Sequence, residues 1–581
     1  MENKLASSNF YIGSRILLEA LLQNNIDTVF GYPGGANLPL YDEMYIQSDI
    51  KHYLYAHEQA ATHAAQGYYR ATGKIAAVFL TSGPGATNGV TGITDALLDS
   101  TPMLIITSQV PSYVIGTDAF QEADVIGITK SITKHNYQVK DVNKLYNTLN
   151  EAIYIASTGR FGPVLVDIPK DVYTLKVENF EATKYIPRQS YNIKTDIEDE
   201  KIQQVVKLVI ASKKPIFYCG GGINAICSDD NTIPIENLLQ IVELTNFPIT
   251  TTLMGLGVFN PEHKNSLQML GMHGTYEANM AMHDCDLMLA IGVRFDDRVT
   301  GKLELFSPNS KKVHIDIDPS ELNKNIKVDI AITGSCDVFL EKLLNELKKQ
   351  QALINHENTK EWWSIINKWK EKDSYGFTQE PNGDILPHYV LDEAYKITKK
   401  YHPFFTTDVG QHQMWAAQYC KVSKQRRFIT SAGLGTMGFG LPAAIGAQIA
   451  KPNDLIVCIT SEGSFMMNMQ ELMTVKKYNL PVKILMLQNN YLGMVRQWQD
   501  LFYSGRLMEV DFEVSAPNFV MLCASFGIKA KVVDKVENVT AAIEEMVNYE
   551  GAYFLSVLTK RKMDVYPMIA PGKAHNEMIF E

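Results

Sequence analysis

The feature that most constrains this chain is an alternation, repeated along its length, of short apolar runs with longer helix-like stretches. The runs are rich in Val, Ile, Leu and Ala and are bounded by Gly, Pro, Asn or Asp. Uninterrupted apolar runs are typical of strands buried on both faces, and the helical stretches supply the crossovers that parallel strands require. The clearest runs are residues 76–80, 103–106, 164–166, 287–291, 455–459 and 482–487. The chain is therefore predicted to be an α/β protein with doubly wound parallel sheets.

Chain length and two polar stretches predict three domains. A chain of 581 residues is too long for one hydrophobic core. Residues 177–200 carry charges and a proline without a periodic apolar face, and residues 348–384 pass from a helix-like segment into Pro-Asn-Gly. Both stretches are typical of linkers. The predicted domains are residues 1–180, 195–350 and 380–565.

Composition excludes several classes of function. The formal net charge is −10, which argues against nucleic acid as the main partner, because neutralising a phosphate backbone needs a basic surface. No apolar stretch reaches the roughly 18 residues of a membrane span, and residues 1–15 hold no apolar signal core. Seven cysteines occur without a C-x-x-C pair, so buried free thiols in a reducing compartment are expected. We expect a bacterial cytoplasmic protein or, if organelle-encoded, a protein of the plastid stroma.

Two loops of the third predicted domain are expected to bring oxygen ligands together. Ser461-Glu462-Gly463-Ser464 follows one predicted strand, and Gln488-Asn489-Asn490-Tyr491-Leu492-Gly493 follows the next. Because ligands bind at the carboxyl ends of parallel strands, a carboxylate and a carboxamide are expected at one sheet edge. Mg²⁺ takes such oxygen ligands together with phosphate and water. Spacing alone also fits ordinary surface loops.

This segment is similar to the motif of the thiamine diphosphate-dependent enzymes, which begins Gly-Asp-Gly-Ser and ends Asn-Asn. The match continues through residues 468–472, read as a helix, and residues 492–495. The resemblance implies that Glu462, Asn489 and the Tyr491 carbonyl hold Mg²⁺ against the cofactor diphosphate. Here Ser461-Glu462 replaces Gly-Asp, and Gln488 replaces the first Asn. Because Glu is one methylene longer than Asp and Mg²⁺ geometry is strict, an altered Mg²⁺ requirement is expected.

The first block carries His57-Glu58-Gln59 at the start of a predicted helix. A lone Glu there usually complements the helix dipole. The resemblance instead implies that Glu58 is the catalytic carboxyl, which bonds the pyrimidine N1′ so that the 4′-amino group takes the C2 proton of the thiazolium. Residues 31–36 and 81–88 are similar to the pyrimidine-binding loops of the same family.

Further loops resemble the family's diphosphate-binding domain. Residues 409–412 and 433–438 match its cofactor loops, and Met437 matches the bulky residue that bends the cofactor. The cofactor contacts implied by this resemblance are Val409, Gly410, Gln411, His412, Gly435, Met437, Gly463, Ser464, Leu492, Gly493 and Met494.

Longer matches narrow the resemblance to one group of enzymes within this family. Residues 116–122 with 132–136, residues 272–279 with 292–301, and residues 494–499 are similar to the anabolic, flavin-containing acetolactate synthases, and the similarity runs over nearly the whole chain. A glycine triplet after the 216–218 strand is weak evidence of phosphate binding by itself. The FAD contacts implied by the resemblance are Arg160, Gly220, Gly221, Gly222, Thr252, Leu253, Met254, His273, Gly292, Arg294, Asp296, Arg298, Asp316 and Asp337.

The resemblance also implies a substrate site and an activity. The substrate residues are Gly35, Phe120, Gln121, Lys170 and Trp498, where the flat wall of Trp498 would favour 2-oxobutanoate over pyruvate as acceptor. The implied reaction is a transferase step that condenses pyruvate with a second 2-oxo acid and releases CO₂, the first common step of valine, leucine and isoleucine biosynthesis. Family members form homodimers or tetramers with active sites at the dimer interface, and many bind a small regulatory subunit.

Two alternatives stay open at this point. One is a related carboligase or oxidase with the same cofactors, against which the long flavin-domain match counts. The other is a paralogue that binds ligands without turnover, suggested by Ser461, Glu462 and Gln488. The intact Glu58 and Asn489 count against it.

Overall fold

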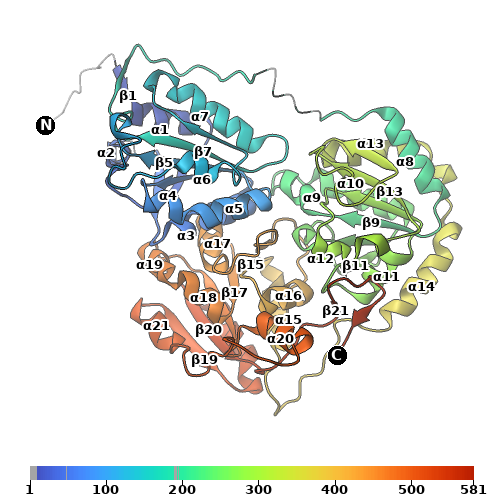
Figure 1. Ribbon diagram of the computed structural model, residues 1–581. Coiled ribbons are helices and arrows are strands. Elements are labelled where there is room, and N and C mark those ends of the chain that lie inside the picture. Colours follow the sequence, from blue (N-terminus) through green and yellow to red (C-terminus); the bar gives the residue numbers. More distant parts are fainter. Residues whose placement is uncertain (1–9, 47–48, 189–190, 192, 194) are drawn as a thin grey trace. The chain divides into compact units, whose positions relative to one another are not determined.

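The computed structural model describes residues 10–46, 49–188, 191, 193 and 195–581 (Figure 1). Its framework is three six-stranded sheets, in which every pair of neighbouring strands is parallel. We call them the first, second and third sheets in chain order. They confirm the predicted α/β class with three parallel-sheet domains.

The first sheet has the order β3-β2-β4-β5-β7-β6. Its strands in that order are β3 (Lys51–Leu54), β2 (Thr28–Gly31), β4 (Ala77–Leu80), β5 (Met103–Gln109), β7 (Pro163–Pro169) and β6 (His135–Gln138). The helices of this region are α1 (Gly13–Gln23), α2 (Leu38–Ile46), α3 (Glu58–Thr72), α4 (Pro84–Asn88), α5 (Val90–Leu98), α6 (Val125–Thr129) and α7 (Val142–Ser157). Side chains of α1, α2 and α7 pack on one face of the sheet, while α3 to α5 lie on the other (Figure 1). Both faces are therefore covered, which explains why these strands are apolar without alternation.

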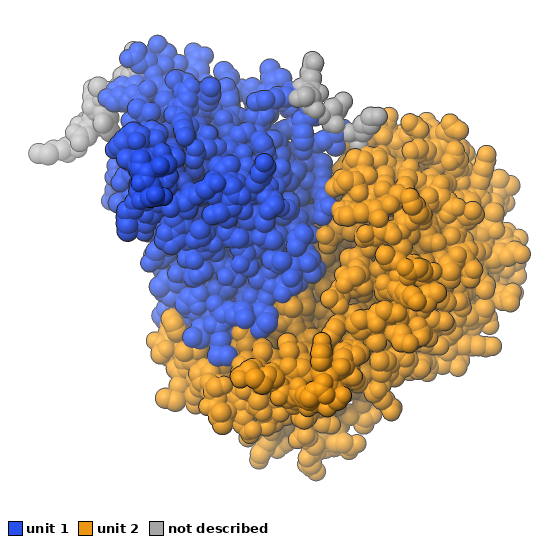
Figure 2. All heavy atoms as spheres, in the orientation of Figure 1, with its two compact units in different colours: residues 1–193, 431–453, 466–481 blue, residues 194–430, 454–465, 482–581 orange. Residues whose placement is uncertain are grey.

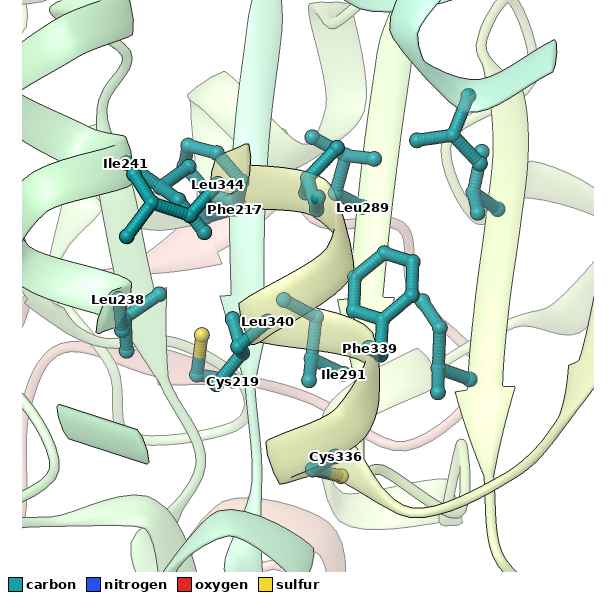
Figure 3. Close-up of a cluster of buried hydrophobic side chains, with 14 of the residues drawn as sticks. Phe217, Cys219, Leu238, Ile241, Leu289, Ile291, Cys336, Phe339, Leu340 and Leu344 are labelled. Atoms are coloured by element: carbon teal, nitrogen blue, oxygen red, sulfur yellow. The ribbon is translucent and has the colours of Figure 1, made fainter. Parts of the chain in front are cut away.

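The second sheet has the order β11-β10-β9-β12-β13-β14. Its strands are β11 (Ser266–Met269), β10 (Ile249–Thr251), β9 (Pro215–Cys219), β12 (Leu287–Ile291), β13 (Lys311–Asp316) and β14 (Ile330–Thr333). Its helices are α8 (Asp199–Ala211), α9 (Gly221–Ile226), α10 (Ile233–Thr245), α11 (Tyr276–Asp284), α12 (Asp297–Thr300), α13 (Cys336–Lys349) and α14 (Lys360–Lys370). Figure 3 shows Phe339 and Leu340 of α13 among Phe217, Leu289 and Ile291 from the strands.

The opposite face of the second sheet is covered by a segment that the sequence assigns to a linker. Trp362 and Ile366 of α14 are fully buried, and they pack with Ile216, Met288 and Ala290 of the strands. The Trp362 indole N–H donates to the Pro215 carbonyl oxygen at 3.1 Å. Part of residues 348–384 thus forms a layer of the second domain rather than a bare connection.

The third sheet has the order β16-β15-β17-β18-β20-β19. Its strands are β16 (Phe428–Thr430), β15 (Phe404–Thr407), β17 (Ile456–Thr460), β18 (Lys483–Gln488), β20 (Tyr553–Leu558) and β19 (Lys529–Val533). Helices along this part of the chain are α15 (Pro387–Thr398), α16 (Gln411–Tyr419), α17 (Gly440–Ala450), α18 (Glu462–Asn468), α19 (Leu472–Lys477), α20 (Gly493–Phe502), α21 (Phe519–Ser525) and α22 (Val539–Asn548). Buried side chains of α15, α16 and α22 cover one face. Two short antiparallel pairs complete the described chain, β1 (Phe10–Ile12) with β8 (Lys176–Glu178) and β21 (Met568–Ile569) with β22 (Met578–Ile579).

Contacts along the chain group it into two compact units (Figure 2). Unit 1 contains residues 1–193, 431–453 and 466–481, and unit 2 contains residues 194–430, 454–465 and 482–581. Helices α17 and α19 therefore belong to unit 1 with the first sheet, although they lie between strands of the third sheet in sequence.

Within unit 1, α3 and α17 approach each other unusually closely. A Cβ atom added at Gly67 of α3 would lie 2.1 Å from the Ala443 carbonyl oxygen, and one added at Gly446 of α17 would lie 2.0 Å from the Ala64 carbonyl oxygen. Both separations are far inside van der Waals contact, so each helix presents a glycine where the other presents its backbone. The small residues Ala64, Ala65 and Gly67 of α3 are thus explained by a helix–helix contact.

The structure bears on the expectations for the cysteines and for membrane-spanning helices. All seven cysteines are free and buried, as predicted. Burial raises the pKa of the Cys285 thiol to about 11 and that of Cys227 to about 12. Among the described residues, no helix combines the length and the apolar composition that crossing a membrane demands. The signal-segment expectation for residues 1–15 falls largely on residues 1–9, outside the described residues.

We predict that Gly67→Ala destabilises the protein. Alanine would favour the helix by about 1 kcal/mol, but overpacking against a rigid neighbour typically costs about 1–3 kcal/mol. The neighbour here is backbone at 2.1 Å, which cannot rotate away, so the steric term should win. Thermal unfolding should show a melting temperature several degrees lower. An unchanged or higher melting temperature would mean that the two helices separate at little cost.

Candidate active site

Glu58 lies at the first turn of α3, where the sequence places it. It is 8% exposed, and its Oε2 accepts a hydrogen bond from Asn88 Nδ2 at 3.0 Å. His57 caps the helix by accepting from the Gln59 amide at its Nδ1. A Cβ added at Gly85 would lie 3.5 Å from Glu58 Oε1, so the 81–88 loop passes directly beside the carboxyl. The structure therefore brings together two of the predicted pyrimidine-site segments.

The loops around Glu58 are tightly fitted. A Cβ at Gly34 would lie within 2.6 Å of the Thr81 side chain. Gly83 has φ +59°, and Gln121, a predicted substrate residue, has φ +62°. A Cβ at Gly83 would lie 2.8 Å from the Gln121 carbonyl oxygen, which ties the substrate loop to the strand end after β4.

The other predicted substrate residues of unit 1 differ in surroundings. Phe120 is 88% exposed, and Gly35 has no atom within 4 Å of an added Cβ. Lys170 follows β7, and its amide donates to the Gln109 carbonyl oxygen at 3.0 Å. Arg160, predicted to contact FAD, also lies in unit 1, where its Nε donates to Ser100 Oγ at 2.9 Å.

The loop that carries Gly435 and Met437 is held within unit 1 by Asp95 of α5 and by Asp99, the residue that caps the end of α5. Asp95 Oδ1 accepts from Ser431 Oγ and from Thr436 Oγ1, and Asp99 accepts from the Ala432 and Gly433 amides at 2.9 and 2.7 Å. Sequence reasoning missed both aspartates, which stand outside every motif. Their only signal is the spacing of four residues that places them on one helical face.

The far end of this loop is fixed by Asn468, whose Nδ2 donates to the Gly438 carbonyl oxygen at 2.7 Å. Asn468 leaves the helical region, with φ −137° and ψ 24°, so the expected helix over residues 468–472 is interrupted. The chain instead forms α18, a 3₁₀ turn over Met469–Glu471, and α19.

The candidate metal loops meet in unit 2. Glu462 begins α18 directly after β17, and its Oε1 accepts from the Asn490 amide at 2.5 Å. Asn489 Oδ1 accepts from the Tyr491 amide at 3.0 Å. Glu462 is fully buried, and its Oε2 has no hydrogen-bond partner among the described residues. Burial raises the pKa of Glu462 to about 7. A buried carboxylate oxygen without a donor is the kind of atom that a cation can satisfy.

The substitution Gln488 has a clear structural role. Its Oε1 accepts from Ser556 Oγ at 2.7 Å, and its Nε2 donates to Asn490 Oδ1 at 3.0 Å. The longer side chain therefore links β20 to the residue whose amide binds Glu462. The two departures from the family motif, Glu462 and Gln488, are joined through Asn490.

The remaining diphosphate-loop residues lie close to one another in unit 2. Ser464 Oγ donates to the Val409 carbonyl oxygen at 3.3 Å, and Gly410 has φ +144°. A Cβ at Gly493 would lie 2.1 Å from Gln411 Oε1, an atom with no hydrogen-bond partner among the described residues. Leu492 and Met494 flank Gly493 at the start of α20. Gly410 and Gly493 therefore contribute backbone without side chains to this edge, which a diphosphate could approach closely.

Four predicted FAD loops lie at the carboxyl ends of four adjacent strands of the second sheet. Gly220 follows β9, Thr252 follows β10, Gly292 follows β12, and Asp316 ends β13. The glycines also serve the chain itself. A Cβ at Gly220 would lie 2.4 Å from the Gly292 carbonyl oxygen, one at Gly222 2.7 Å from Gly292 Cα, and one at Gly221 3.0 Å from Met254 Cβ.

Other predicted FAD residues of unit 2 lie in segments that follow strands of the second sheet. Thr252 caps the Leu253–Gly255 turn, Asp296 caps α12, and Ser335 Oγ donates to Asp337 Oδ1. Burial lowers the pKa of His273 to about 4 and raises that of Asp296. Arg294 lies next to Phe295, a buried residue with φ +50°.

Arg298 and Trp498, predicted for different ligands, are neighbours. The guanidinium carbon of Arg298 lies 6.0 Å from the centroid of the Trp498 ring, within the range of a cation–π contact. Arg298 lies in α12 and Trp498 in α20, and both helices belong to unit 2.

Within the described part of the chain, no three His, Cys, Asp or Glu side chains are grouped so as to hold a metal. A magnesium ion at Glu462 would therefore take its other ligands from an amide oxygen, a backbone carbonyl and a bound diphosphate.

Three family models match the chain. Residues 12–128 match the N-terminal TPP binding domain of the thiamine pyrophosphate enzymes, residues 202–343 their central domain, and residues 408–557 their C-terminal TPP binding domain. The matches follow the order of the three sheets.

Named relatives extend the similarity to the whole chain. It is 44% identical over 570 residues to the acetolactate synthase large subunit of Buchnera aphidicola subsp. Schizaphis graminum. The matched region covers 97% of this chain and 98% of the relative. The Haemophilus influenzae large subunit is 44% identical over 573 residues, covering 98% of both chains. Acetolactate synthase isozyme 3 large subunit of Escherichia coli K12 is 41% identical over 573 residues, covering 97% and 98%. These similarities confirm the resemblance inferred from the motifs.

We predict that His412 contributes acid-sensitive stability. Burial lowers its pKa to about 3, whereas an unfolded histidine titrates near 6.5. Below pH 6.5 the unfolded chain therefore binds a proton that the folded chain rejects, so this stabilisation is complete above pH 6.5 and is lost as pH falls towards 3. The loss is about 1.4 kcal/mol per pH unit.

His412→Gln should therefore show a shallower fall in melting temperature between pH 6.5 and 5 than the unmodified chain. His356→Gln, which replaces an exposed histidine, is the control. Parallel curves for all three proteins would contradict the assignment.

Proposed function

The chain belongs to the acetolactate synthase large subunits, within the thiamine pyrophosphate enzyme family, and we propose that it condenses pyruvate with a second pyruvate or with 2-oxobutanoate, releasing CO₂. The observation that carries the proposal is the position of Glu58, a buried carboxyl at the N-terminus of α3 with the 81–88 loop beside it. The reaction would serve branched-chain amino acid biosynthesis. The domains proposed for it are residues 1–180 for the pyrimidine, 195–350 for FAD and 380–565 for the diphosphate.

The metal loop fits a magnesium diphosphate. The unpartnered Oε2 of Glu462 offers a negative oxygen, and Asn489 and the Tyr491 carbonyl offer neutral ones. Gly463 and Gly493 add no side chain, and Gly410 and Gln411 border the same edge. We propose that Glu462, Asn489 and Tyr491 hold Mg²⁺ and that the neighbouring loops hold the diphosphate.

Thiamine diphosphate, when bound, supplies a C2 carbon that adds to the pyruvate carbonyl and accepts the electrons released with CO₂. Glu58 holds or gives up a proton at the pyrimidine N1′. Asn88 orients that carboxyl through its 3.0 Å hydrogen bond. Met437 lies in the loop that Asp95 and Asp99 hold, and we propose that its side chain contacts the bound cofactor and favours the bent conformation.

The four adjacent strand ends of the second sheet support an FAD site. Their loops, together with His273, Arg294, Asp296 and Arg298, are the proposed contacts. Because the glycine triplet is already required by contacts with Gly292 and Met254, the triplet supports this proposal less strongly than the convergence of the strands.

We propose that Trp498 forms a wall of the acceptor site and that Arg298 fixes its ring through a cation–π contact at 6.0 Å. In unit 1, the proposed substrate residues are Gly35, Phe120, Gln121 and Lys170. A homodimer or tetramer is the proposed assembly. The relatives' name, large subunit, supports a small regulatory partner, and the bacterial relatives support a cytoplasmic location.

Acetolactate formation tests the proposal directly. The purified chain should form acetolactate from pyruvate only when thiamine diphosphate, FAD and Mg²⁺ are all present. Glu58→Gln should lower kcat by about 100-fold or more, because general acid–base groups contribute that order. Glu277→Gln, at a buried carboxylate of α11 bonded to Ser374, is the control. An active Glu58→Gln variant would contradict the proposed catalytic role of Glu58.

The Ser461→Gly, Glu462→Asp double variant tests the metal loop. We expect it to reach half-maximal rate at a lower Mg²⁺ concentration, because the shorter carboxylate restores the family's geometry. A higher requirement would show that Glu462 and Gln488 have adapted to each other.

Trp498→Leu should reduce the preference for 2-oxobutanoate over pyruvate as acceptor by roughly tenfold, the order that one methylene group is worth in a pocket. Competition between the two acceptors, with quantification of both products, measures it. An unchanged product ratio would remove Trp498 from the acceptor site.

A further inference from the structure

A second buried carboxylate holds the start of α3. Glu471, in the 3₁₀ turn between α18 and α19, is fully buried. Its Oε1 and Oε2 each accept from the Ala56 amide at 3.1 Å, and its Oε1 also accepts from the His57 amide at 3.0 Å. Glu471 therefore binds the two backbone amides that immediately precede Glu58.

Neighbouring side chains of the same segment hold the preceding residues. Thr474 Oγ1 lies 2.8 Å from Glu471 Oε2 and 3.0 Å from the Leu54 carbonyl oxygen, and Tyr478 Oη accepts from the Leu54 amide at 2.8 Å. Residues 471, 474 and 478 thus hold residues 54 to 57 at several backbone groups, all within unit 1.

Helix α3 does not need this contact to be capped. His57 already binds the Gln59 amide, and Ala56 lies outside the helix. A buried carboxylate that receives backbone amides is costly unless it is fully bonded, and burial raises the pKa of Glu471 to about 7 despite those bonds. An unfavourable second carboxylate beside Glu58 needs a reason other than capping.

We propose that Glu471 is a positioning residue for Glu58, fixing the backbone at Ala56 and His57 so that the Glu58 carboxyl is held at the cofactor's pyrimidine. The inference rests on the proposed role of Glu58. Rigid backbone at this point matters because displacing a catalytic group by about 1 Å can cost on the order of 100-fold in rate.

Glu471→Gln tests the inference. Glutamine replaces one of the two acceptor oxygens with an amide group that donates, so the Ala56 N–H, which lies 3.1 Å from both carboxylate oxygens, loses one acceptor and faces a donor instead. We expect kcat for acetolactate to fall roughly tenfold to 100-fold while KM for pyruvate changes less than about twofold. Exchange of the C2 proton of bound thiamine diphosphate for deuterium should slow by the same factor. In the cofactor-free chain, the Ala56 and His57 amides should exchange with solvent faster.

Thr474→Val and Thr474→Ser form a milder pair, useful if Glu471→Gln does not fold. Valine removes the hydroxyl bonded to Glu471 and serine keeps it, so only Thr474→Val should slow C2 exchange. Glu277→Gln controls for the loss of a buried carboxylate elsewhere.

Wild-type C2 exchange in Glu471→Gln, or in Thr474→Val if that pair must decide, would overturn the inference. So would equal losses in Glu277→Gln. Glu58→Gln separates this failure from failure of the proposed function. If Glu58→Gln exchanges normally, the role of Glu58 is wrong; if it does not exchange while Glu471→Gln does, only the role of Glu471 is wrong.

Discussion

The contact between α3 and α17 is the constraint on which the rest of unit 1 depends. Each helix places a glycine against the backbone of the other, at positions where even a methyl group would overlap a carbonyl oxygen. Helix α3 begins at Glu58, and α17 follows the loop that carries Gly435 and Met437. A close contact without long side chains fixes one helix against the other with little freedom, so two segments far apart in sequence acquire a defined spacing.

Buried carboxylates refine that spacing. Asp95 and Asp99 hold the loop before α17, and Glu471 holds the residues before α3. In each case the acceptors bind backbone amides or hydroxyls of a loop that would otherwise have unsatisfied groups. Apolar packing fixes the helices, and charged hydrogen bonds then fix the loops. The second step is directional, which positioning a reacting group requires.

The sequence predicted the sheets well because their signal is local. Continuous apolar runs such as residues 287–291 coincide with β12, since both faces of a parallel strand are buried. The role of α14 was harder to predict, because its polar residues are typical of a linker and do not indicate that Trp362 packs on the second sheet. The interruption at Asn468 could not be predicted, because it depends on a hydrogen bond to Gly438, 30 residues away.

The same difference between local signals and contacts distant in sequence applies to the site residues. Glu58, Glu462 and Asn489 lie in motifs, from which their roles were predicted. Glu471 also lies in a matched motif, but its partners, Ala56 and His57, are 415 and 414 residues away in the sequence. Gln488 illustrates the converse. By sequence it is a departure from the family motif, yet its amide bridges Ser556 and Asn490, whose backbone N–H binds the other departure, Glu462. Two changes that are separately unfavourable for a metal loop are therefore one connected arrangement, in which the longer Gln488 supports the backbone that receives the longer carboxylate. That coupling favours a metal loop that still binds Mg²⁺ over one that has decayed.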